Sequence, residues 1–210
     1  MYKNILFDVD GTLIDTEKPI IHSLQKVLKE ELNIKKSYND LLFVLGVPGK
    51  YSLEKLNIPK DKLDYILNKW SHTISLNQSK MRLFDDIEYV LQNLYNNKIN
   101  LAIITSKNDE EMKNEFSPFN IDKYFSSIVT ASDTKLHKPN PDPILKAMDN
   151  LNITNKEKTI YIGDSIYDMK SAKAAGIAFG LAKWGTPTPN AFKNLDHSFN
   201  KPTDILKLIK

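Results

Sequence analysis

The stretch that decides the fold is Asn4-Ile5-Leu6-Phe7-Asp8-Val9-Asp10-Gly11-Thr12-Leu13-Ile14-Asp15-Thr16. An apolar run that ends on an acidic residue is typical of a buried parallel strand with polar side chains at its carboxyl end. Open α/β sheets bind their ligands at that end of the strands. Side chains alternate along an extended chain, so we expect Asp8 and Asp10 to point the same way, while Gly11 allows a sharp turn beside them.

These two carboxylates repel each other unless a cation or a shared proton lies between them. Taken alone, the stretch fits a strand that ends in a plain polar turn equally well. The rest of the chain therefore has to decide between a structural turn and a functional site.

Composition places the chain among ordinary globular proteins. Its 210 residues suffice for one core, or for a core with a small inserted domain, and 41% are hydrophobic. The 29 basic and 26 acidic residues are scattered, which argues against a nucleic-acid partner, because such proteins gather basic residues on one face. Arg82 is the only arginine, so bidentate recognition of a phosphate by arginine is nearly excluded.

Several classes of site and location are also disfavoured. The chain has no cysteine, which excludes disulfides, thiolate metal sites and cysteine nucleophiles. Charged residues interrupt the N-terminal region before any long apolar stretch, so we expect no signal peptide. No apolar segment is long enough to span a membrane. We expect a cytoplasmic protein, a monomer or a homodimer, without a membrane partner.

The order of the patterns along the chain predicts an interrupted α/β fold. From Thr16 to Ser79 the apolar spacing indicates helices only, with a loop at Gly46 to Lys50. Strands are expected at 99–106, 127–130, 159–163 and 178–182, with helices between them and with the last strand closing the sheet. Strands that alternate with helices form parallel βαβ units. We expect a doubly wound, Rossmann-like core from residues 1–15 and 80–210, and a small helical domain, residues 16–79, inserted after the first strand.

Acidic residues follow two of these strands. Asp8 and Asp10 follow the first, and Asp164, with Asp168 one helical turn later, follows the strand at 159–163. The carboxyl ends of parallel strands meet at one edge of a sheet, so we expect these carboxylates to converge. Oxygen ligands without cysteine or clustered histidine favour a hard cation, most simply Mg²⁺.

Hydroxyls and a lysine complete the pattern. Thr105 and Ser106 end the strand at 99–106, and Lys138 lies in the loop after the strand at 127–130. A hydroxyl and an ammonium group opposite a bound cation would form a seat for a phosphoryl group.

Four segments in this order resemble the motifs of the haloacid dehalogenase superfamily. They are Asp8-Val-Asp-Gly-Thr-Leu, the strand that ends in Thr105-Ser106, Lys138-Pro-Asn-Pro-Asp and Gly163-Asp-Ser-Ile-Tyr-Asp168. Within the superfamily, the chain is most similar to the phosphoglycolate phosphatase-like branch with a small helical cap. The resemblance covers nearly the whole chain and implies a phosphatase that acts on a small phosphorylated metabolite.

The resemblance also implies a role for each motif residue. Asp8 would attack phosphorus to form an aspartyl phosphate, and Asp10 would act as general acid and then as general base. Mg²⁺ would lie between Asp8, the main-chain carbonyl of Asp10 and Asp164. Thr105 and Ser106 would hold the transferring oxygens, and Lys138 would offset their charge. Asp168 would hold Lys138.

Plain structural interpretations stay open beside these roles. Asp164 could cap the following helix, Asp168 and Lys138 could be solvated charges, and Thr105 could be a turn residue. His137 fits a surface loop better than a catalytic role. Lys50 could contact substrate, because the equivalent segment of relatives faces the active site, or its glycine-rich loop could be a plain hinge.

Three other activities compete with small-phosphomonoester hydrolysis. A β-phosphoglucomutase-like phosphoryl transfer uses the same chemistry, but mutases of this superfamily have an arginine near the position of Gly49, and this chain has none there. An inorganic pyrophosphatase is the second. A phosphoacceptor signalling module is the third, although such modules lack the long helical insertion. Phosphoglycolate is the substrate we expect, and this expectation rests on the resemblance alone.

Overall fold

The computed structural model describes residues 1–209, and its core is a six-stranded parallel sheet. Along the sheet the strands follow the order β5-β4-β1-β6-β7-β8, and every neighbouring pair is parallel. Their bounds are β1 Asn4–Phe7, β4 Asn100–Ile104, β5 Ser127–Val129, β6 Thr159–Gly163, β7 Ala178–Ala182 and β8 His197–Phe199. The predicted α/β, doubly wound class is confirmed. The expectation that residues 178–182 close the sheet is wrong, because β8 pairs with the outer edge of β7.

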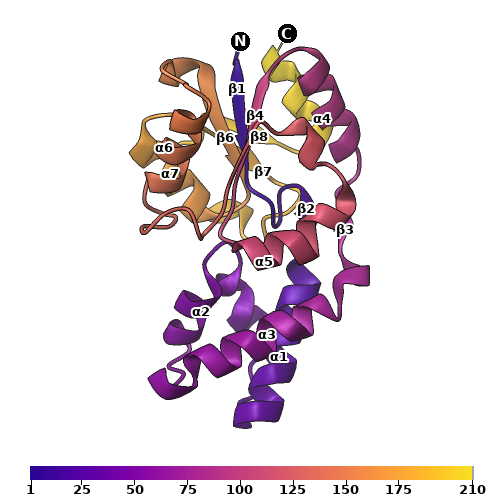
Figure 1. The fold of residues 1–210 in the computed structure, drawn as a ribbon, viewed down its shortest axis with the longest axis vertical. Coiled ribbons are helices and arrows are strands. Elements are labelled where there is room, and N and C mark those ends of the chain that lie inside the picture. The colour runs from indigo at the N-terminus through magenta and orange to yellow at the C-terminus, as the bar shows by residue number, and fades with distance from the viewer. Residues whose placement is uncertain (210) are drawn as a thin grey trace.

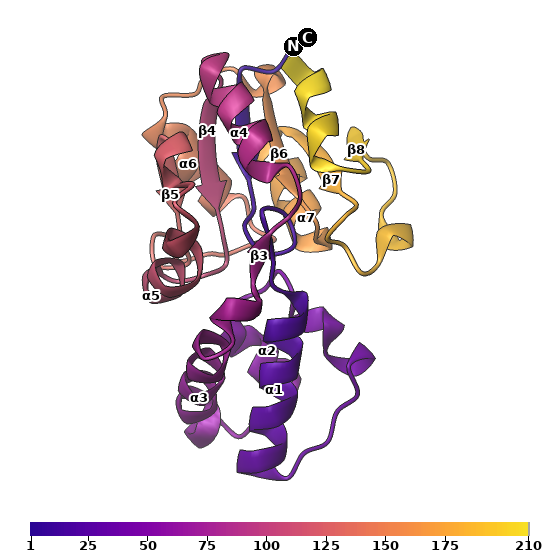
Figure 2. The ribbon, with the colours of Figure 1, turned by 90° about the vertical axis from the view of Figure 1, so that its right-hand side faces the viewer.

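Helices cover both faces of this sheet, as its alternating side chains require. Ile5 and Phe7 of β1 belong to one buried cluster, while Leu6 between them belongs to the other. Helix α4 (Ile87–Asn96) and the 3-10 helix η9 (Pro202–Ile209) pack on the first face, and α6 (Asp142–Asn150) and α7 (Ile166–Ala175) on the second (Figure 2). The apolar strands predicted from the sequence are therefore buried on both sides.

A group of helices follows the first strand and lies beyond the carboxyl end of the sheet (Figure 1). We call it the helical insert: α1 Glu17–Leu32, η1 Asn39–Val44, α2 Gly49–Lys55, η2 Lys60–Lys62 and α3 Leu63–Ser75. Helices α1 and α3 pack against each other through side chains such as Leu24, Ile66 and Trp70. Two short antiparallel strands, β2 (Ile14–Asp15) and β3 (Arg82–Leu83), lie where the chain leaves and re-enters the core. The sequence analysis did not predict this ribbon.

The remaining elements are short. They are η3 Gln78–Lys80, α5 Asp109–Glu111, the π-helical turn η4 Met112–Phe116, η5 Ser117–Phe119, η6 Asp122–Tyr124, η7 Lys156–Lys158 and η8 Pro189–Ala191. Among residues 1–209, no helix combines the length and the apolar character needed to cross a membrane.

Candidate active site

Three strands of the sheet deliver polar residues to one edge. Asp8, Thr105 and Asp164 each come directly after the last residue of β1, β4 and β6. The backbone ladder continues through two of them: the Asp8 amide donates to Ile162 and the Thr105 amide to Val129, at 2.9 and 3.0 Å. The parallel topology thus fixes the positions of these residues, as the sequence pattern predicts.

The loop after Asp8 turns tightly, and a segment distant in the sequence forms a hydrogen bond to it. Gly11 has a φ of 72°, which glycine adopts without strain, and the amides of Thr12 and Leu13 both donate to the Val9 carbonyl. A Cβ atom on Gly11 would overlap the Asp164 carboxylate. From the C-terminal part of the chain, the Trp184 indole donates to the Thr12 carbonyl at 3.0 Å. The two motif loops are therefore packed without room for a side chain at Gly11.

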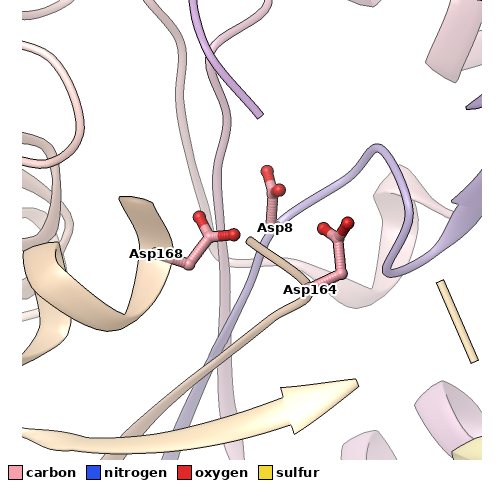
Figure 3. A group of neighbouring side chains, drawn as sticks. All are labelled: Asp8, Asp164 and Asp168. Atoms are coloured by element: carbon pink, nitrogen blue, oxygen red, sulfur yellow. The ribbon is translucent and has the colours of Figure 1, made fainter. Parts of the chain in front are cut away.

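Asp8, Asp164 and Asp168 form a buried carboxylate cluster (Figure 3). Each offers an oxygen within 4.8 Å of the others, and none exposes more than 4% of its surface. Burial and the neighbouring Asp168 raise the pKa of Asp8 to about 7. Burial, with Asp168 and Asp8 nearby, also raises the pKa of Asp164 well above its ordinary value. Three close carboxyl groups with two raised pKa values have a strong tendency to take up either protons or a cation.

Lys138 is the cation of this cluster. Its Nζ lies 3.0 Å from Asp8 Oδ1 and 2.7 Å from Asp168 Oδ1, and its side chain is 1% exposed. It also donates to the Tyr161 hydroxyl, which in turn donates to the Ile104 carbonyl. Burial alone would lower the pKa of Lys138, but Asp168 and Asp8 raise it above its ordinary value, so the group stays charged. Lys138 is therefore not a solvated loop charge.

Asp168 is positioned by the start of helix α7. The Ser165 amide and hydroxyl donate to Asp168 Oδ2 at 3.0 and 2.6 Å, and the Asp168 amide donates back to Ser165 Oγ. Ser165, and not Asp164, is the N-cap of this helix. Gly163 leaves the space, because a Cβ there would meet the Asp168 carboxylate at 2.6 Å. The plain alternatives for Asp164 and Asp168, a helix cap and a solvated charge, are both contradicted.

The residues present fit a hard cation. Asp8 Oδ2 is buried and makes no hydrogen bond, although a buried carboxylate oxygen normally has a partner. Asp164 is bound only by a long hydrogen bond of 3.4 Å from the Thr12 hydroxyl. Asp8, Asp164 and Asp168 all offer carboxylate oxygens as metal ligands, and Mg²⁺ prefers oxygen ligands of this type. Lys138 already occupies one oxygen of Asp8 and one of Asp168, so Asp8 Oδ2 and Asp164 are the better placed pair.

Asp10 lies in a second charged group that the sequence analysis missed. Lys107 Nζ is 3.1 Å from Asp10 Oδ1 and also forms an ion pair with Glu115, and Lys107 and Glu115 are 6% and 2% exposed. Burial would lower the pKa of Lys107, but Asp10 and Glu115 raise it, which keeps the ammonium charged. In the sequence, Lys107 and Glu115 are two charged residues of a predicted helical region, and no spacing rule marks them as buried. The only signal was that Lys107 directly follows Ser106.

The other residues predicted for the site have mixed positions. Thr105 is buried, and its hydroxyl accepts the Lys107 amide at 3.1 Å. The Ser106 hydroxyl donates to the Gly46 carbonyl of the helical insert at 3.2 Å. Lys50 points elsewhere: its ammonium pairs with Asp64 at 3.2 Å, and both side chains are more than half exposed. Thr105 and Ser106 thus join the acidic residues at the strand ends, while Lys50 does not.

An open cleft lies between the strand ends and the helical insert, and residues of both line it. Its core side includes Asp8, Asp10, Ser106 and Lys107. Its opposite wall comes from the insert and is mostly apolar, with Ile20, Val44, Val47, Leu67, Trp70 and Ile74 beside Gly46, Gly49 and Ser71. Asp8 and Asp10 therefore line the same open cleft as the helical insert.

Known proteins match the chain over nearly its whole length. The sequence pattern of the family described as haloacid dehalogenase-like hydrolase matches residues 5–182. A relative from Caldanaerobacter subterraneus subsp. tengcongensis, provisionally named pyrophosphatase PpaX, is 32% identical over 98% of this chain and 94% of its own. A phosphoglycolate phosphatase of Aquifex aeolicus is also 32% identical, over 98% and 95%.

A solved structure agrees with these relatives. The crystal structure of a Lactobacillus plantarum protein, provisionally described as a phosphoglycolate phosphatase, superimposes with a TM-score of 0.91. The two chains are 25% identical, and the match covers 99% of each.

Proposed function

This chain belongs to the haloacid dehalogenase-like hydrolase family and is a phosphatase, and we propose that it hydrolyses a small phosphomonoester with the help of Mg²⁺. The observation that carries this proposal is the buried cluster of Asp8, Asp164 and Asp168 with Lys138, at the edge of an open cleft between the core and the helical insert. Of this cluster, Asp8 lines the cleft.

The chemistry follows from the positions of Asp8 and Asp10. A carboxylate oxygen of Asp8 attacks phosphorus in line, the bond from phosphorus to the ester oxygen breaks, and the departing oxygen takes a proton from Asp10. A water molecule then gives a proton to Asp10 and attacks phosphorus, and the bond to Asp8 breaks to release phosphate. Both side chains line the same cleft, which is the geometry this exchange needs.

A cation held by Asp8, the Asp10 carbonyl and Asp164 would supply charge neutralisation between the anionic nucleophile and the anionic substrate. Asp8 has to be deprotonated to attack, and its raised pKa means that the protein alone stabilises the proton-bound form near neutral pH. Lys138 opposes this tendency, because its ammonium is 3.0 Å from Asp8 Oδ1.

The remaining predicted residues complete the proposed binding site. Lys138 also offers positive charge to the transferring oxygens, and Asp168 holds it in place at 2.7 Å. The Thr105 hydroxyl and the Ser106 amide would hold those oxygens from the end of β4. We further propose that residues 16–79 act as a cap that shields the reaction from bulk water, and that the protein acts in the cytoplasm.

Inorganic pyrophosphate is a second candidate substrate. It is favoured by one observation, the relative named as a pyrophosphatase that matches 98% of this chain. Both substrates would use the same nucleophile, so only a substrate panel separates them.

Phosphate release from a panel of esters and pyrophosphate, with and without Mg²⁺, tests the proposal. We expect release that requires Mg²⁺ and is lost in Asp8→Asn. Asp15→Asn is the matched control, because Asp15 is a nearby acid that pairs with Arg82 outside the cluster. Quenching with borohydride, which reduces an acyl phosphate to an alcohol, should mark residue 8 in the peptide mass. Release by Asp8→Asn at the wild-type rate would contradict the mechanism.

A further inference from the structure

Acidic side chains outnumber basic ones along the lining of the cleft. Among the described residues, four carboxylates and one ammonium line it: Asp8, Asp10, Glu111, Glu115 and Lys107. The Lys107 ammonium forms ion pairs with Asp10 and Glu115, so its positive charge is already neutralised by neighbouring carboxylates. Lys138 lies beside Asp8, and a cation held by Asp8 and Asp164 would add its charge at the same phosphoryl end of the site. The part of the cleft away from phosphorus therefore offers no unmatched positive charge.

Lys50 and Arg82 are both paired with acidic residues outside the cleft. Lys50 pairs with Asp64, and its side chain is 56% exposed. Arg82 pairs with Asp15 on the ribbon beside the core, and its side chain is 74% exposed. Neither is among the residues that line the cleft.

The wall that faces the carboxylates is mostly apolar, and Ser71 supplies its one hydroxyl, which donates to Glu111. Trp70 is 4% exposed, and its N–H donates to the Ile20 carbonyl at 3.1 Å, so the ring presents carbon atoms to the cleft. Val44, Val47 and Ile74 are each at least 92% buried and have no polar side-chain atom. Such a wall favours apolar surface on a ligand and gives no compensation to a buried charge.

The helical insert already touches the core on both sides of this wall. Ser106 donates to the Gly46 carbonyl, and Ser71 donates to Glu111 across the cleft at 3.4 Å. The apolar wall therefore stands directly opposite Asp8 and Asp10 (Figure 1 shows α2 and α3 below the strand ends).

From this arrangement we infer that the alcohol part of the substrate is uncharged and presents apolar surface. The inference rests on the proposed phosphomonoester hydrolysis and narrows it. It disfavours phosphoglycolate and pyrophosphate as substrates, because both carry a negative charge beyond the transferred phosphoryl group. Glu111 is the lining carboxylate through which we test this preference, because Ser71 and the Asn108 amide donate to it but no lysine or arginine forms an ion pair with it among the described residues.

A matched pair of esters tests the charge. Phosphoglycolamide has the shape of phosphoglycolate but no carboxylate, and we expect its kcat/KM to be at least about tenfold higher. Extending ethyl phosphate to butyl phosphate should raise kcat/KM by about fourfold per added methylene. A higher kcat/KM for phosphoglycolate or pyrophosphate than for the amide would overturn the inference while leaving the phosphatase proposal intact. No release from any of these compounds would overturn both.

A pair of variants tests the cause. Glu111→Gln keeps an acceptor for the Asn108 amide but removes the charge, and we expect it to raise kcat/KM for phosphoglycolate several-fold more than for the amide. Glu110→Gln, the exposed neighbour outside this cleft, makes the same change in net charge. An equal response of both variants, or none, would show that the carboxylate of Glu111 does not set the preference.

Discussion

The ammonium of Lys107 lies 3.1 Å from Asp10, and the same ammonium pairs with Glu115 eight residues further along the chain. Both partners of this second pair are nearly fully buried. The pair thus holds Asp10, the proposed proton donor, against the end of β4. A buried ion pair is costly to break on one side, because the remaining charge has lost its partner.

We expect Lys107→Met to lower the free energy of unfolding by about 3–5 kcal/mol. Burial raises the pKa of Glu115, so the abandoned carboxyl group can take up a proton and limit part of this loss at low pH. Urea unfolding at pH 5 and pH 8 measures the difference. The double variant Lys107→Met with Glu115→Leu should recover most of the stability but not the activity. Full activity in the double variant would show that Asp10 needs no such support.

Protonation of the acidic cluster should compete with cation binding. Burial raises the pKa of Asp8 from 3.8 to about 7, so the metal-free folded protein binds a proton there that the unfolded chain releases near pH 4. Its contribution to stability is present below pH 4 and is lost as the pH rises through 7. A proton and a cation would compete for these carboxylates, so Mg²⁺ should bind more tightly, and its binding should release fewer protons, as the pH rises through 7.

Thermal unfolding with and without Mg²⁺ measures this competition. We expect the increase in Tm from added Mg²⁺ to be larger at pH 8 than at pH 6. At a Mg²⁺ concentration 100 times Kd, binding should add about 2.7 kcal/mol to the free energy of unfolding. Asp164→Asn is the comparison, since it removes one proposed ligand and should abolish most of the increase. An increase that is equal at both pH values would contradict the role of Asp8 and Asp164.

Loss of Lys138 should leave two buried carboxylates without their shared cation. We expect Lys138→Met to cost about 3–5 kcal/mol of unfolding free energy in the absence of metal, and Mg²⁺ should restore part of it. Lys135→Met, at an exposed position of the same loop, should change stability by less than about 0.5 kcal/mol. Chemical denaturation of the wild type and both variants, each with and without Mg²⁺, gives the free energies of unfolding to compare.

Much of the fold and the acidic part of the site follow from local patterns. Continuous apolar runs mark β1, β4 and β6, and parallel pairing then brings Asp8 and Asp164 together whatever the loops do. Strand β8 has only three residues, too few for a periodic pattern, and its place depends on pairing with β7. The pairing of Lys107 with Glu115 depends on how the π-helical turn Met112–Phe116 packs, which charged residues in a helical pattern do not reveal.

Gly185 should matter for the site although it lies far from it in sequence. A Cβ on Gly185 would overlap the carbonyl group of Gly11, in the loop that separates Asp10 from the helical insert. We expect Gly185→Ala to cost about 1–3 kcal/mol and to weaken Mg²⁺ binding, because the shifted Gly11 loop presses on Asp164. Calorimetric titration with Mg²⁺ measures the affinity. Lys183→Ala, an exposed change in the same segment, should leave it unaltered.

For Lys50, the expectation from the sequence and the observed geometry disagree. The sequence suggests contact with substrate, whereas the ammonium is 3.2 Å from Asp64 and the pair is exposed. An exposed ion pair contributes about 0–1 kcal/mol, so Lys50→Gln should barely change stability. Because this ammonium does not line the cleft, kcat/KM for an uncharged ester should stay within about twofold of wild type. A rise in KM of tenfold or more, with kcat unchanged, would instead place Lys50 on the substrate and would add a second ammonium to the cleft beside Lys107, which is already paired with Asp10 and Glu115.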